Sequence, residues 1–164
     1  MSLLLHRAYK LYTEGKPMEE IAAWVEANKL RCHAWLTVDD LKYLKRGGRI
    51  SAIAATMGTM LDLKPVITLN REGSMAAVDK IRGRKAALRY VADKTAELIE
   101  NPAEQELIIL QADAKEDADR LEALIRERVP DIGSITQYYI GPVIGAHCGP
   151  GTVASCFMGK ERSV

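Results

Sequence analysis

The sequence lacks the features that mark secreted, membrane-spanning and disulfide-stabilised proteins. Its first ten residues, MSLLLHRAYK, contain three consecutive leucines before a charged pair, too few apolar residues for a signal peptide or a membrane span. It has only three cysteines, and an odd number without a secretory signal argues against a disulfide framework. We therefore expect a cytoplasmic protein with no membrane span.

Aromatic residues and net charge are also scarce. Aromatics make up 5% of the chain and the formal net charge is +1. The segment 41–95 nevertheless has 12 Lys and Arg against 4 Asp and Glu, whereas 96–135 has 4 against 11. This asymmetry is compatible with a nucleic-acid face, an anion site or solvated helices. Because no aromatics alternate with the basic residues to stack on bases, we expect no nucleic-acid partner.

The remaining composition is that of an ordinary globular protein: 164 residues, 48% of them hydrophobic, suit one domain. Apolar spacing predicts two opening helices, the second beginning at Pro17 and burying Met18, Ile21, Ala22 and Val25. A strand at 31–38 follows, and then a short helix, capped by Asp39 or Asp40, that ends at Gly47-Gly48.

The rest of the chain alternates between predicted strands and helices. Further strands are predicted at 66–69, 75–81, 106–112, 133–140 and 152–158, with a hairpin turn at 70–74. Helices are predicted over 50–61, 88–99 and 115–128, and 141–151 reads as a tightly turned glycine- and proline-rich loop. We predict a single α/β domain over 1–164, with a helical lead-in at 1–30 and a lobe at 31–160 that has a mixed β-sheet flanked by helices.

Three segments could bind an anion. In DDLKYLKRGGRIS, Gly47 and Gly48 precede a helix that would begin near Arg49, and a helix start beside an arginine attracts anions. In VDKIRGRKAAL, Lys80 and Arg82 would project from one face of a strand. Each segment could equally be a solvated surface.

The third segment is GPVIGAHCGPG, whose small residues would let the backbone approach a ligand beside His147. Cys148 next to His147 suggests a thiol nucleophile, but adjacent residues in an extended chain usually point apart. The spacing of His147, Cys148 and Cys156 fits no usual zinc pattern, so we expect no metal and no catalytic residues.

The predicted helix over 50–61 has an apolar face that includes two methionines. Its members are Ile50, Ile53, Met57, Met60 and Leu61. Methionine adapts to varied alkyl shapes, although such a face is also ordinary core packing.

In their order, DDLKYLKRGGRIS, LKPVITLNREGSMAAVDKIRGRKAAL and IGPVIGAHCGPGTVASCF resemble the C-terminal part of the DegV family of bacterial fatty-acid-binding proteins. The resemblance covers about 15–157. It implies a lobe that binds a long-chain fatty acid, with Arg49, Arg82 and His147 around the carboxylate. Ser51, Gly145 and Gly149 would be further loop positions, and Ile53 and Met57 would line the apolar tunnel.

The resemblance also implies partners. A complete member would have another lobe upstream, and some members present the carboxylate to a fatty acid kinase, so we expect a lipid carrier with no cofactor and no enzymatic activity. An uncovered tunnel face would favour a partner or a homodimer. The alternatives are a hydrolase or transferase that uses Cys148 and His147, and a dimerisation module that binds no small ligand.

Overall fold

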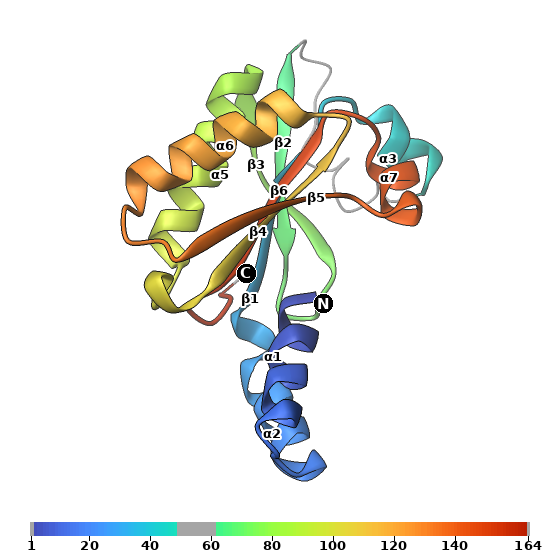
Figure 1. Ribbon diagram of the computed structural model, residues 1–164. Helices are drawn as coiled ribbons and strands as arrows, with labels where there is room; N and C mark the ends of the chain where they lie inside the picture. Colours follow the sequence, from blue (N-terminus) through green and yellow to red (C-terminus); the bar gives the residue numbers. More distant parts are fainter. Residues whose placement is uncertain (1, 49–61, 164) are drawn as a thin grey trace.

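The computed structural model describes residues 2–48 and 62–163, and it forms a mixed α/β structure in which helices flank one sheet (Figure 1). Its described α-helices are α1 (Ser2–Thr13), α2 (Met18–Asn28), α3 (Lys42–Arg46), α5 (Arg84–Leu98), α6 (Lys115–Arg128) and α7 (Pro142–Cys148). Its strands are β1 (Cys32–Thr37), β2 (Leu63–Leu69), β3 (Met75–Arg82), β4 (Glu106–Ala112), β5 (Ser134–Tyr139) and β6 (Thr152–Met158). Short 3-10 turns lie at Lys29–Arg31 and Pro102–Glu104.

The six strands form one sheet in the order β3-β2-β1-β6-β4-β5. The pairs β3–β2, β2–β1, β1–β6 and β6–β4 are antiparallel, whereas β4 and β5 are parallel. Helix α6 makes the crossover between the parallel strands, as a β-α-β connection requires. The predicted mixed sheet with flanking helices is therefore confirmed.

Helices α5 and α6 cover one face of the sheet (Figure 1). Fully buried side chains from strands, such as Val66, Ile109 and Phe157, pack there against Leu88 of α5 and Leu121 of α6. These apolar contacts form the main core. Each such side chain stabilises the fold by roughly 1.5–3 kcal/mol when it is removed from water.

The other face of the sheet is apolar but less completely covered by the described residues. Leu36, Ala154, Leu110 and Tyr138 lie in one register row, across β1, β6, β4 and β5. Leu36 and Leu110 are half-buried and Tyr138 is 51% exposed. A smaller buried cluster of Val38, Leu44, Ile67 and Cys148, with Leu36 packed against it, lies at one end of this face.

The structure corrects two local predictions. Residues 141–151 do not form only a loop, because α7 spans Pro142–Cys148 within them. On α2, Met18 is 68% exposed and Ala22 is also exposed, so that of the predicted apolar face only Ile21 is fully buried. The predicted helix over 50–61 lies outside the described residues.

Candidate functional site

The three candidate segments meet at one end of the sheet. The registers Thr37↔Val66 and Thr37↔Val153 place the end of β1 beside the middle of β2 and the start of β6, so that the chain after β1 continues toward the start of β2. Leu63 pairs with Arg82, so β3 ends at this same edge. The segment that contains α3 follows β1, and α7 immediately precedes β6, so all three segments lie at the end where Figure 1 shows α3 and α7.

The segment 39–48 runs antiparallel to the loop 147–151 and packs closely against it. A methyl group added at Gly151 would lie 2.5 Å from Cβ of Asp39. One added at Gly149 would overlap the ring of Tyr43, and one added at Gly47 would overlap Nδ1 of His147. The small residues of the two segments are therefore required for this contact, which we call the α3–α7 contact.

Local sequence signals explain why both segments adopt these shapes. The backbone N–H of Lys42 donates to Oδ1 of Asp40 at 2.8 Å. The N-cap residue of α3 is nevertheless Leu41 and not the predicted Asp39 or Asp40. Gly149 ends α7 with φ +80°, a left-handed conformation that glycine adopts without a steric penalty. Lys64 of β2 forms an ion pair with Asp39 at 2.7 Å, which connects this segment to the sheet.

His147 lies in the last turn of α7 and is half-buried. Its Nδ1 atom is buried and has no hydrogen-bond partner among the described residues. Burying a polar nitrogen without a partner is costly, unless a ligand or water satisfies it. Gly145, two residues earlier, has open space beside its Cα.

Arg82 is the last residue of β3 and is exposed. It lies at the correct end of the sheet, but no described contact joins it to His147. The other predicted site residues, Arg49, Ser51, Ile53 and Met57, lie outside the described residues, so their roles stay predictions.

Arg84 is a residue of this region that the sequence analysis missed. Its Nε atom donates to Asp117 of α6 at 2.7 Å, and its Nη2 atom donates to the carbonyl of Gly151. Arg84 thus connects the start of α5 to α6 and to the glycine loop that carries His147. Within the cluster KIRGRKA the sequence has no signal that separates Arg84 from Arg82, because the predicted helix began only at residue 88 whereas α5 begins at Arg84.

The thiol of Cys148 is poorly suited to nucleophilic catalysis. Its side chain is buried in the cluster with Val38, Leu44 and Ile67. Burial raises the pKa of Cys148, and for Cys156 burial raises the pKa to about 12. Since the thiolate is the reactive form, these environments suppress reactivity. Among residues 2–48 and 62–163, no group of three or more His, Cys, Asp or Glu could hold a metal ion.

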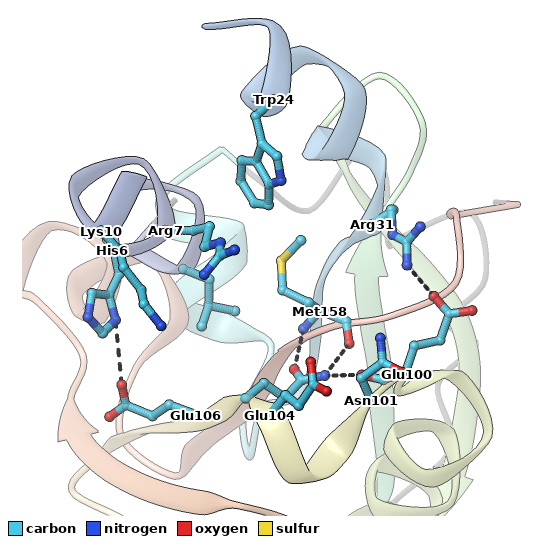
Figure 2. A pocket seen from close by; sticks show the side chains of 12 residues that line it. His6, Arg7, Lys10, Trp24, Arg31, Glu100, Asn101, Glu104, Glu106 and Met158 are labelled. Atoms are coloured by element: carbon cyan, nitrogen blue, oxygen red, sulfur yellow. Dashed lines mark hydrogen bonds and ion pairs between the residues drawn. The ribbon is translucent and has the colours of Figure 1, made fainter. Parts of the chain in front are cut away.

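A cavity of about 400 Å³ (Figure 2) lies beside α1 and α2, at the end of the sheet opposite to α3 and α7 (Figure 1). His6, Arg7 and Lys10 of α1 and Trp24 of α2 lie on one side of it. Two of its basic side chains lie beside carboxylates: Nδ1 of His6 is 3.6 Å from a carboxylate oxygen of Glu106, and Arg31 pairs with Glu100. The α3–α7 contact lies at the other end of the strands, so we do not assign the predicted anion site to this cavity. No described helix is long and apolar enough to span a bilayer.

Comparison with known proteins defines the class. A mixed six-stranded α/β lobe of this topology occurs in a fatty-acid-binding DegV family protein from Streptococcus agalactiae, with a TM-score of 0.81, 28% identity, and 96% of this chain and 55% of that chain covered. It also occurs in a Streptococcus pneumoniae fatty acid kinase B3 protein loaded with linoleic acid, with a TM-score of 0.82 and 18% identity over 96% of this chain and 55% of that one. At that identity the second likeness shows the fold alone.

The sequence comparisons identify the family. The family model described as "Uncharacterised protein, DegV family" matches residues 1–160. A DegV domain-containing protein of Clostridium perfringens is 42% identical over 160 residues, which are 98% of this chain and 55% of that protein. The chain belongs to the DegV family, and it spans about half the length of the curated relatives that it matches.

Proposed function

We propose that this chain is a lipid-binding lobe that holds the carboxylate of a long-chain fatty acid with Arg49, Arg82 and His147. The observation that carries the proposal is the α3–α7 contact. It involves a histidine at the end of an apolar sheet face whose buried nitrogen has no hydrogen-bond partner in the part of the chain that the structure describes. Family membership and the fatty-acid-binding relative from Streptococcus agalactiae support it.

The head-group end suits a carboxylate. A carboxylate that enters an apolar site loses its hydration, and charge-assisted hydrogen bonds must replace the lost water contacts. The Nδ1 atom of His147 is a group with unused hydrogen-bonding capacity, and Arg82 ends its strand at the same edge of the sheet. Gly145, which has open space beside its Cα, and Ser51 would let the backbone approach the ligand, whereas Gly149 would act indirectly through its contact with Tyr43.

The less covered sheet face suits the alkyl chain. Leu36, Leu110 and Tyr138 form a continuous row across the sheet, and Leu36 also packs against the cluster that contains Cys148, the neighbour of His147. The apolar surface is thus continuous with the head-group end. Each methylene buried on it contributes about 0.8 kcal/mol, and Ile53 and Met57 would complete the tunnel.

In this proposal the lobe is a carrier without catalytic residues and without a cofactor, and it acts in the cytoplasm. The half of its relatives' length that this chain does not span would supply a further lobe around the head group. A separate fatty acid kinase would then act on the presented carboxylate. A homodimer is an alternative way to cover the apolar face.

Native mass spectrometry of the bacterially expressed chain with oleate tests the proposal. A second sample, in which the chain is joined to the remaining part of the Clostridium perfringens relative, tests the same lobe with a complete partner. We expect one bound acyl chain, and we expect His147→Ala and Arg82→Ala to weaken binding about 10- to 100-fold, because a hydrogen bond to a charged group is worth about 1.5–3 kcal/mol.

Two variants serve as matched controls. His6→Ala removes a histidine from the opposite end of the sheet, and Arg89→Ala removes an exposed arginine from α5. Both should leave the affinity unchanged. Failure of both samples to take up an acyl chain would contradict the proposal, and equal losses in the site and control variants would contradict the assigned residues.

A further inference from the structure

A small cavity of about 30 Å³ lies under the C-terminal segment, on the sheet face covered by α5 and away from the α3–α7 contact. His33 and Trp35 of β1 and Thr68 of β2 line it, together with Leu98 at the end of α5 and Arg162. When the register of Leu36↔Ile67 and Thr37↔Val66 is extended by one residue, Thr68 lies opposite Trp35. The cavity therefore lies where two strands, a helix end and the C-terminal segment meet.

Four side chains around this cavity each carry a buried polar atom that has no hydrogen-bond partner within residues 2–48 and 62–163. The atoms are Nδ1 of His33, Nε1 of Trp35, Oγ1 of Thr68 and Nε of Arg162. Their residues are only 3%, 5%, 2% and 8% exposed. Buried polar groups are nearly always paired, because an unpaired group has lost its hydrogen bonds to water without a replacement. Four such atoms around one cavity indicate a bound group that satisfies them.

We propose that this cavity binds one water molecule that is shared by His33, Trp35, Thr68 and Arg162. The volume is sufficient, since a site needs only about 10–15 Å³ to hold a water. The side chains of Trp35 and Arg162 can only donate hydrogen bonds, so the occupant must accept two hydrogen bonds, one from each. Nε2 of His33 lies 2.7 Å from the carbonyl of Lys160. That carbonyl can only accept, so Nε2 carries the proton and Nδ1 of the neutral ring needs a donor.

This pattern favours water over a small anion. Water can accept from Trp35 and Arg162 while it donates to His33 and to the hydroxyl of Thr68, which gives the four hydrogen bonds of a fully satisfied site. A halide could accept but could not donate to His33. Desolvation, with a smaller contribution from the charge of Arg162, lowers the pKa of His33 and so favours the neutral ring.

The water would complete the attachment of the C-terminal segment to the sheet. Arg162 donates from Nη1 to the carbonyl of Cys32 at 2.6 Å and from its backbone N–H to Leu30 at 3.0 Å. Arg71, in the β2–β3 turn, donates to the carbonyl of Arg162 at 2.7 Å. The shared water adds β1 and β2 side chains to these direct contacts.

A crystal structure at atomic resolution, grown near neutral pH with bromide in place of chloride, tests the proposal. We expect one peak within hydrogen-bond distance of at least three of the four atoms, with no anomalous bromide signal. A bromide peak, an empty cavity, or direct hydrogen bonds among the four side chains that close the cavity would each overturn it.

A solution measurement gives an independent readout. The indole proton of Trp35 should show a nuclear Overhauser effect to a long-lived water, and the other tryptophan, Trp24, serves as the internal reference. Thr68→Val keeps the side-chain shape but removes one partner of the water, so we expect this cross-peak to be lost. Thr13→Val, at an exposed position, should leave it unchanged. Absence of the cross-peak in the unmodified protein, or its persistence in Thr68→Val, would contradict the shared water.

Discussion

The imidazole of His33 lies in an environment where a positive charge is costly. The ring stacks on Phe157, with centroids 5.0 Å apart and an interplanar angle of 9°. Burial is the main reason why the pKa of His33 is lowered, and the guanidinium of Arg162 lowers it further. The carbonyl of Lys160 and the carboxylate of Glu100 act in the opposite direction but do not prevail. Folding thus favours the neutral form.

We therefore expect the protein to lose stability as the pH falls below the usual histidine pKa. The unfolded chain binds a proton at about pH 6.5 whereas folded His33 does not, so the free energy of unfolding falls by at most about 1.4 kcal/mol per pH unit. The loss continues until the pH passes the lowered pKa of the folded state. Urea titrations across this range measure it, and His33→Gln should flatten the dependence.

The control is His6→Gln, because the side chain of His6 is 65% exposed. The pH dependence of His6→Gln should follow that of the unmodified protein. A His33→Gln variant with the same slope as the unmodified protein would show that His33 is not the titrating group.

At the scale of elements, α7 depends on its contact with α3. A seven-residue helix is far below the length at which an isolated helix is stable in water. The α3–α7 contact stabilises this short helix, because the ring of Tyr43 lies directly against Gly149 and His147 lies against Gly47. The orientation of His147 therefore follows from glycines on two separate segments.

Gly149→Ala tests this dependence, and Gly73→Ala is a matched control. Both glycines have φ +80°, but an added methyl group at Gly73 meets nothing within 4 Å, whereas at Gly149 it overlaps Tyr43. We expect Gly73→Ala to cost about 1–2 kcal/mol from backbone strain alone. Gly149→Ala should cost about 1–3 kcal/mol more from overpacking, as measured by urea denaturation. Equal costs would show that the helices do not pack as described.

The sequence predicted most elements, since apolar spacing is strong where one face is buried. It missed the start of β2 because Pro65 is unusual inside a strand; here Pro65 pairs with Lys80 of β3, beyond the residues paired with β1. It missed α7 because Gly141, Pro142 and Gly149 suggest a turn, although they act as the boundaries of a short helix.

The site was harder to predict than the elements. Spacing alone could not show that Gly47 faces His147, because the contact joins segments 100 residues apart and only the folded sheet end brings them together. The resemblance to a family, carried by the order of three motifs, predicted only that Arg49, Arg82 and His147 surround one head group, and it did not predict the contact between Gly47 and His147. Arg84 was missed because its importance depends on Asp117 and Gly151, which are distant in sequence.

At the scale of the whole molecule, burial is unevenly distributed. Helix α5 has five buried residues, Ala87, Leu88, Val91, Ala92 and Thr95. Ile21 is the only buried residue of α2, and no side chain from Leu3 to Thr13 of α1 is buried. Figure 1 shows these two helices extending from the sheet at the end opposite to α3 and α7. The lead-in at 1–30 and the lobe at 31–160 should therefore differ in local stability.

We expect backbone amides in α1 and α2 to exchange with deuterium far faster than those in α5. Local opening needs little free energy where few apolar contacts are lost. The side chains of Leu5, Tyr9 and Tyr12 are already exposed in the folded state, so opening of α1 removes little apolar burial from them. The ion pair between His6 and Glu106 should not change this, because surface pairs are worth about 0–1 kcal/mol. Hydrogen exchange followed by mass spectrometry measures the difference, and His6→Ala should leave it unaltered. Equal protection of α1 and α5 would mean that something buries the open face of α1, and a partner lobe or a second copy of the chain would then have to be sought on that face.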